Sequence, residues 1–333
     1  MRKLYLDVIR NYIKFYNVDG FRFDLMGILD VDTMNEIYRQ ARNIKPDVLI
    51  YGEGWDMPTA LSETEKARIY NQHRMPGIGH FNDTFRDVAK GRTSDDSKYD
   101  KGYLTGNLDM AFDMCSVLTG NTLGDPYFRR FDSPVQSINA LETHDNATIW
   151  DKMHACCGEE PREVRLMRQK LMIAATLVAQ GIPFLHAGME FCGTKQDNSN
   201  SYNAGDVINQ MNWDRMILNY DIVRYTQRMI QLRRNWKAFR LDTAALVEKY
   251  VHFSIVEGGV VLYDIDYNDG HHQSAGVRVI INPSLDERRF HFEHEYSIIA
   301  DENGLPQEGE QAEIYVPRCS TLVLSRPISK VGE

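Results

Sequence analysis

The feature that most constrains the fold is an alternation of short apolar segments with amphipathic ones early in the chain. The apolar segment 18–24 is followed by a segment with helical periodicity, 31–44, which ends before Pro46. A second apolar segment, 48–55, comes next. Strand, helix and strand at this spacing form a βαβ unit, and such units build parallel sheets. We therefore expect an α/β fold at the beginning of the chain.

The same alternation continues further along the chain. Additional strand candidates lie at 75–83, 137–146 and 182–191, and residues 164–181 read as a buried helix closed by glycine. The intervening stretch 91–134 is polar and irregular. It predicts long loops and short helices at the rim of a site.

A different pattern begins after a helical segment at 221–237. Short β-rich segments such as VVLYDIDY and GVRVIINP are separated by Gly, Asn, Asp and Pro, which is typical of an all-β sandwich. We place the boundary near 238–242. The sequence thus predicts a catalytic α/β domain over residues 1–240 and a β-sandwich domain over 241–333.

Composition narrows the classes of partner. The net charge is −9, and no basic stripe with interleaved aromatic residues occurs, so nucleic acid is not an expected partner. No run of about 18 apolar residues exists, so we expect no membrane span. The five cysteines are odd in number and lack Cys-x-x-Cys spacing, which favours reduced thiols. We expect a cytoplasmic protein, although an export signal in a preceding segment remains an alternative.

Three acidic residues end strand candidates: Asp24, Glu53 and Asp145. In a barrel of parallel strands the carboxyl ends share the face that carries chemistry. Arg22 lies on the same strand face as Asp24, and a neighbouring cation favours an ionised carboxylate. Glu53 lies between two glycines and beside Trp55, an apolar setting that favours a protonated acid.

A nucleophilic carboxylate and a protonated acid are the pair that a glycoside hydrolase requires. The alternative is a plain ion pair between Arg22 and Asp24 that joins two elements. The order and spacing of the three acidic segments favour the catalytic interpretation.

These segments resemble motifs of the α-amylase superfamily of glycoside hydrolases, and most closely those of type I pullulanases. Segment 19–27, DGFRFDLMG, resembles the strand-4 motif of that family, and segment 51–55, YGEGW, resembles the strand-5 motif. Segment 142–146, ETHDN, is similar to the strand-7 motif. The resemblance implies a retaining hydrolase that debranches α-1,6 linkages in α-glucans such as pullulan, glycogen and limit dextrins.

The resemblance also implies a role for each residue. Asp24 is the expected nucleophile, with Arg22 as its charge partner. Glu53 is the expected general acid and base. Asp145 is expected to stabilise the transition state, and His144 to donate a hydrogen bond to a sugar hydroxyl.

Further substrate-binding residues are expected on either side of these motifs. Residues 194–213 are similar to a pullulanase segment whose Asn and Tyr residues line the substrate cleft. Asn198 and Tyr202 are therefore expected to bind substrate, as are Arg22 and Trp55. His186 is interpreted as a core histidine.

No cofactor is expected, and Ca²⁺ is a low-ranked alternative. A calcium loop combines several oxygen ligands with a glycine and a terminal glutamate. The acidic cluster Asp95, Asp96 and Asp100 lacks that pattern.

One departure from the family is large. Its strand-3 motif ends in an Asn-His dipeptide, and this dipeptide does not occur in the 333 residues. We therefore expect a partial (β/α)₈ barrel of about strands 4–8, followed by the β-sandwich. An α-glucan is the expected ligand. The alternative is an inactive or weak fragment, which binds α-glucan without cleaving it or needs the missing N-terminal half of the barrel as a partner.

Overall fold

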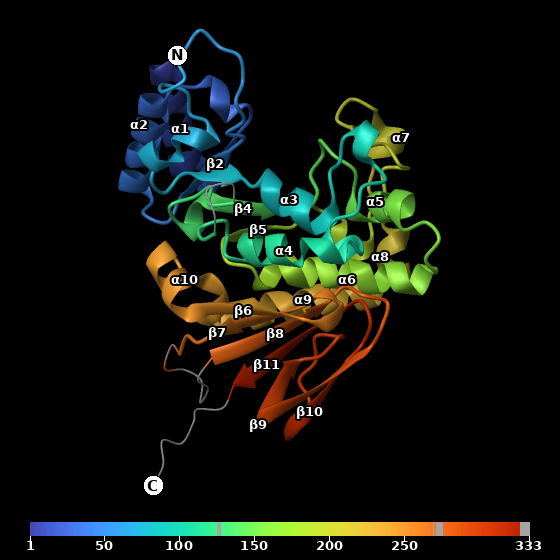
Figure 1. The fold of residues 1–333 in the computed structure, drawn as a ribbon. Helices are drawn as coiled ribbons and strands as arrows, with labels where there is room; N and C mark the ends of the chain where they lie inside the picture. Colours follow the sequence, from blue (N-terminus) through green and yellow to red (C-terminus); the bar gives the residue numbers. More distant parts are fainter. Residues whose placement is uncertain (125–127, 269, 271–275, 327–333) are drawn as a thin grey trace.

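The computed structural model describes residues 1–124, 128–268, 270 and 276–326, which form two sheets with helices packed around the first (Figure 1). The helices are α1 (Arg2–Tyr16), α2 (Val31–Ile44), α3 (Asp83–Lys90), α4 (Ala111–Leu118), α5 (Ile149–Cys156), α6 (Arg162–Val178), α7 (Asp206–Asn209), α8 (Asp214–Leu218), α9 (Tyr220–Asn235) and α10 (Ala244–Tyr250). The strands are β1 (Gly20–Phe23), β2 (Leu49–Gly52), β3 (Gly79–Phe81), β4 (Ser137–Ala140), β5 (Ile182–Phe184), β6 (Val251–Val256), β7 (Val260–Ile265), β8 (Gly276–Asn282), β9 (Arg288–Ala300), β10 (Glu310–Val316) and β11 (Ser320–Arg326).

The first sheet is parallel and has the order β1-β2-β3-β4-β5. Each strand is followed by helical structure before the next begins, as the alternation in the sequence predicts. The register places Phe23 opposite Gly52, so the residues that follow them, Asp24 and Glu53, leave neighbouring strands side by side. The expected partial barrel followed by a β domain is confirmed.

Helix α2 shows how the local sequence sets the boundaries of an element. Asp30 caps its N-terminus and accepts a hydrogen bond from the Thr33 amide at 2.7 Å. Met34 and Ile37 are fully buried on one face, where the helix packs against α1 and the first two strands. Capping and apolar spacing together explain why the helix coincides with the predicted range 31–44.

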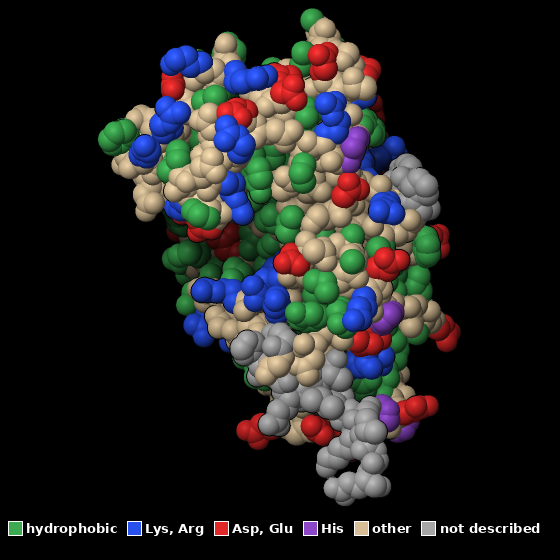
Figure 2. Space-filling model, turned by 90° about the vertical axis from the view of Figure 1, so that its left-hand side faces the viewer, with side chains coloured by type: hydrophobic (Ala, Val, Ile, Leu, Met, Phe, Trp, Pro, Cys, Tyr) green, Lys and Arg blue, Asp and Glu red, His purple; other side chains and the backbone are tan. Residues whose placement is uncertain are grey.

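The parallel sheet is open, because β1 and β5 have a sheet neighbour on one side only. Its aromatic face carries Tyr51, Phe81 and Phe184, whose rings pack edge to face at centroid distances of 5.6 and 5.3 Å. Tyr51 and Phe184 remain only partly buried. On the side of the molecule that Figure 2 shows, hydrophobic side chains gather in a hollow below the N-terminal helices. The sheet therefore presents apolar surface and two strand edges.

Segment 91–134 contains the predicted short helices, but more of it is buried than its polar composition suggests. Its central part supplies buried residues to the largest hydrophobic core, among them Tyr103, Leu104, Met114 and Leu118. Helix α4 contacts both α3 and β7. Residues 108–118 are in fact largely apolar and include α4, but the Asp, Gly and Ser residues on both sides led to the prediction of a polar, irregular segment.

The second sheet is antiparallel, with the order β10-β9-β11-β8-β7-β6. Alternate residues of β7, such as Val261 and Tyr263, face a core shared with α6, which lies between the two sheets (Figure 1). The intervening residues, such as Val260 and Leu262, face a separate core that includes Ile314 of β10. The two buried faces therefore belong to one continuous hydrogen-bonded sheet.

All five cysteines are free thiols. Among the helices that the structure describes, none is both long enough and apolar enough to cross a membrane.

Candidate active site

The turns after β1 and β2 are held together by close backbone contacts. The Gly27 amide donates to the Glu53 carbonyl at 3.0 Å, and the Glu53 amide donates to the Phe23 carbonyl at 3.0 Å. A Cβ at Gly27 would lie 1.9 Å from the carbonyl oxygen of Trp55, so only glycine permits this approach. Leu25 turns the chain with a positive φ of 46°. The result fixes Asp24 and Glu53 next to each other.

Arg22 connects these two carboxylates. Its Nη1 donates to Asp24 Oδ1 at 2.6 Å, and its Nη2 donates to Glu53 Oε1 at 2.6 Å. Glu53 Oε2 also accepts a hydrogen bond from the Leu25 amide at 3.1 Å. The Glu53 side chain is 9% exposed and that of Asp24 is 68% exposed. One guanidinium therefore bridges a buried carboxylate and an accessible one.

The sequence predicted the first of these contacts and missed the second. Arg22 and Asp24 are two residues apart on one strand, whereas Glu53 is brought in by the pairing of β1 with β2. The prediction that Arg22 distinguishes the two carboxylates by pairing with one of them is incomplete. Exposure to solvent distinguishes them instead.

Glu53 and Asp145 meet at a cavity of about 180 Å³. Trp55 and Phe81 provide its aromatic lining, and Asn82 and Asp83 contribute polar groups. His144 Nε2 lies 3.2 Å from Asp145 Oδ2, and both side chains are about half exposed. The structure thus brings Glu53, Trp55 and Asp145 together, with Arg22 and Asp24 joined to them through Glu53.

A buried lysine supports the turn that carries Asp145. Lys90 is fully buried at the end of α3, and its Nζ donates to Asn146 Oδ1 at 3.0 Å and to the Ala147 carbonyl at 2.8 Å. Burial lowers the pKa of Lys90 to about 7. Asn146 also lines the cavity. This role could not be predicted from the sequence, because a lysine near the end of a short polar helix resembles a solvated one.

A second buried contact lies at the end of β4. Glu142 is 2% exposed, and its Oε1 lies 3.1 Å from His186 Nδ1. The Ile149 amide at the start of α5 donates to the other carboxylate oxygen. His186 therefore links the turn after β5 to the turn after β4, as a histidine paired with a buried acid.

Asn198 and Tyr202 do not line the cavity that contains Glu53. Tyr202 is 64% exposed, and Asn198 Oδ1 accepts from the Asn200 amide at 2.9 Å. The adjacent Asp197 and Ser199 line a different cavity, of about 330 Å³. Substrate binding by Asn198 and Tyr202 stays a prediction.

Of the acidic residues near position 95, Asp100 has a basic partner. Asp100 Oδ2 accepts from Arg92 Nε at 2.8 Å. Within the described part of the chain, no group of three or more His, Cys, Asp or Glu side chains is arranged to hold a metal ion. The prediction on Ca²⁺ is untested.

Comparison with known proteins gives similar proteins that include pullulanases, while no protein-family model matches the chain. A pullulanase of Bacillus subtilis (strain 168) is 38% identical over 312 residues, which are 92% of this chain and 43% of that protein. A glycogen operon protein GlgX homolog of Mycobacterium bovis is 25% identical over 279 residues, which are 72% of this chain and 35% of that protein.

Solved structures agree with these relatives. The type I pullulanase of Bacillus subtilis str. 168 complexed with maltose superposes with a TM-score of 0.91 at 36% identity, and covers 98% of this chain and 46% of its own. The pullulanase of Anoxybacillus sp. LM18-11 complexed with maltotetraose gives a TM-score of 0.90 at 35% identity, with 98% and 46% covered. The chain is therefore similar in sequence and in fold to type I pullulanases over most of its own length, and it spans less than half the length of these relatives.

Proposed function

We propose that this chain carries the acid-base and nucleophilic groups of a retaining hydrolase that cleaves α-1,6 branch linkages of α-glucans. The observation that carries the proposal is the bridge from Arg22 to Asp24 and Glu53 at the ends of adjacent parallel strands. A structural ion pair requires one carboxylate. Two carboxylates at the carboxyl ends of adjacent strands, one buried and one open to solvent, match the nucleophile and the general acid of a double-displacement reaction.

In this mechanism Asp24 attacks the anomeric carbon, since it is the accessible carboxylate. Glu53 protonates the departing glycosidic oxygen and then removes a proton from the water that releases the sugar. Arg22 holds both carboxyl groups in position, and it compensates the negative charge of Asp24 at first and of Glu53 after it has released its proton. Asp145 and His144, in the turn after β4, stabilise the charge on the sugar ring and bind its hydroxyls.

The proposed ligand is an α-glucan chain. Two of the similar structures are complexes with maltose and with maltotetraose. The aromatic residues Trp55 and Phe81 beside Glu53 suit the apolar faces of a sugar ring.

A second candidate function is binding of α-glucan without cleavage. Two observations favour it: the parallel sheet has two open edges, and the Asp24 side chain is largely in solvent. Electrostatic stabilisation of a transition state weakens when water enters the site. In this case activity requires a partner that covers the open side of the sheet, for which a complementary half-barrel is the fitting shape.

The experiment compares hydrolysis and binding in parallel. Release of reducing ends from pullulan is measured for the chain alone and for a hybrid in which the segment preceding the match in the Bacillus subtilis pullulanase is fused before residue 1. Asp24→Asn and Glu53→Gln are tested beside Asp32→Asn, an exposed aspartate of α2 that serves as a matched control.

The proposal predicts hydrolysis by the hybrid, its loss in the first two variants and full activity in the control. Binding of pullulan without hydrolysis by either form would favour the second function. Full activity of Asp24→Asn would contradict the proposed mechanism.

A further inference from the structure

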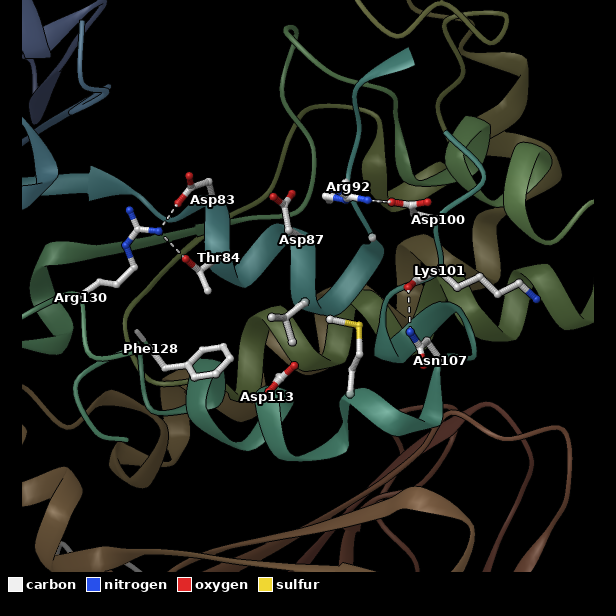
Figure 3. Close-up of a pocket in the computed structure, with 13 residues that line it drawn as sticks. Asp83, Thr84, Asp87, Arg92, Asp100, Lys101, Asn107, Asp113, Phe128 and Arg130 are labelled. Atoms are coloured by element: carbon white, nitrogen blue, oxygen red, sulfur yellow. Dashed lines mark hydrogen bonds and ion pairs between the residues drawn. The ribbon is translucent and has the colours of Figure 1, made fainter. Parts of the chain in front are cut away.

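A larger cavity lies next to the candidate active site, on a neighbouring face of helix α3. Its volume is about 480 Å³, which falls in the range of about 300–1,000 Å³ found for small-molecule sites. It lies between α3, the first turn of α4 and the loop residues beside them, and it is partly open to solvent (Figure 3). Asp83 lines both this α3–α4 cavity and the cavity that contains Glu53, so the two are adjacent.

The charges around the α3–α4 cavity nearly balance. Among the described residues, four carboxylates line it, those of Asp83, Asp87, Asp100 and Asp113. Three of them pair with arginines, Asp83 with Arg130, Asp87 with Arg86 and Asp100 with Arg92. The Lys101 ammonium extends away from the cavity (Figure 3). An anionic ligand such as a phosphate would meet the carboxylates, and a cation would meet the basic groups. The balance favours an uncharged ligand that can both donate and accept hydrogen bonds.

Ion pairs hold several of these groups in place. Arg130 Nη1 donates to Asp83 Oδ1 at 3.1 Å and to Thr84 Oγ1 at 2.7 Å, and Arg92 pairs with Asp100 (Figure 3). A paired carboxylate still has lone pairs that accept from a hydroxyl. The lining is therefore ordered before a ligand arrives, which lowers the entropic cost of binding.

The cavity also has an apolar side. Val88, Met110 and Phe128 line it, and the Phe128 ring and the Asp113 carboxylate lie between the two helices in Figure 3. An aromatic ring beside carboxylates and an amide, here that of Asn107, suits a molecule with apolar C–H faces and hydroxyl edges. A sugar ring has this surface.

We propose that the α3–α4 cavity is a second saccharide-binding site, which holds a segment of the α-glucan chain beside the candidate active site. The choice of an α-glucan rests on the proposed function, whereas the preference for an uncharged polyhydroxylated ligand rests on the lining alone. Because Asp83 lines both cavities, a glucan chain held in the second lies beside the first. Binding at the second cavity then raises the effective concentration of substrate at the first.

The test is an NMR titration of the full chain with maltotetraose. Met110 lines the α3–α4 cavity and Trp55 lines the Glu53 cavity, so a labelled methionine methyl group and a labelled indole N–H report on the two sites separately. We expect the Met110 methyl signal to shift with maltotetraose. Loss of one charged hydrogen bond in Asp113→Ala should weaken the response of Met110 about tenfold.

The matched control is Asp109→Ala, which makes the same change in charge at an exposed aspartate that does not line the cavity. It should leave the Met110 titration unchanged. Asn107→Ala, outside any helix, is a second test variant in case loss of Asp113 from the first turn of α4 impairs folding.

The titration distinguishes failure of the second saccharide site from failure of the proposed active site. A Trp55 shift without a Met110 shift would overturn the second site and leave the proposed function standing. A Met110 shift that neither Asp113→Ala nor Asn107→Ala weakens would also overturn it. A Met110 shift that the variants weaken supports the second site, whether or not Trp55 responds. If Trp55 does not respond, this result counts against the active-site proposal alone.

Discussion

Replacement of Arg22 by methionine should lower the free energy of unfolding by about 2–4 kcal/mol. A hydrogen bond to a charged group contributes about 1.5–3 kcal/mol, and the upper part of that range applies to Glu53 because its carboxylate is 9% exposed. The exposed pair with Asp24 adds about 0–1 kcal/mol. The Leu25 amide still donates to Glu53 and limits the loss.

The assay is urea unfolding followed by circular dichroism. With a slope of about 2 kcal/mol per molar urea, the middle of the usual range, the midpoint of Arg22→Met should fall by about 1–2 M. Arg22→Lys keeps the charge but loses the fork that reaches both carboxylates, so it should recover only part of the loss. In the Arg22→Met background, Glu53→Gln should cost less than it does alone, because the carboxylate left without its cation is removed.

Two results would refute this reasoning. One is a loss below about 1 kcal/mol for Arg22→Met, the amount expected of a surface ion pair. The other is an equal coupling of Arg22 to Asp24 and to Glu53 in double-mutant cycles, since burial separates the two carboxylates.

Three further predictions concern neighbouring residues. In a hydrolytically active form, Glu53→Gln should retain activity on substrates with good leaving groups, whereas Asp24→Asn should lose activity on all substrates. The assigned roles would be contradicted if the hydrolysis rates of the two variants depended equally on the pKa of the leaving group. The pKa of Lys90 is about 7 in the folded chain, against an ordinary value of 10.5. The unfolded chain therefore binds this proton more tightly than the folded chain does. As a result, the free energy of unfolding should rise by about 1.4 kcal/mol per pH unit from pH 7 to pH 10. Lys90→Met should remove this contribution to the slope in urea titrations across that range, and an unchanged slope would exclude Lys90 as its source. Gly27→Ala should destabilise the chain by about 1–3 kcal/mol, because its Cβ meets the Trp55 carbonyl; a thermal melt identical to that of the parent would show that the two turns separate easily.

The strand order and the ends of the first two strands were predictable, because the βαβ alternation there is regular. The strand candidates 137–146 and 182–191 were predicted too long, since β4 ends at Ala140 and β5 at Phe184, and Asp145 therefore lies in the turn after β4. The βαβ alternation at 18–55 fixed the direction of the first two strands, and the acidic residues directly after them had to share one edge. The contact from Arg22 to Glu53 depends on the register between strands, which the sequence does not specify.

Most of the site contacts that could not be predicted from the sequence involve buried charged residues. Lys90 and Glu142 are enclosed by segments distant in the chain, and a charged residue is solvated by default in a sequence-based prediction. The buried core within 91–134 was missed for a related reason, since its apolar residues find partners in β7 and α6 rather than within the segment.

Trapping of the covalent intermediate would test most directly whether Asp24 is the nucleophile. A fluorinated α-maltosyl substrate with a good leaving group would be incubated with the chain, or with the hybrid where only the hybrid hydrolyses pullulan, and the digested protein analysed by mass spectrometry. We expect a glycosyl adduct on Asp24, the accessible carboxylate that Arg22 bridges to Glu53. An adduct on any other residue, or turnover of the reagent without an adduct at Asp24 and with inversion at the anomeric carbon, would contradict it.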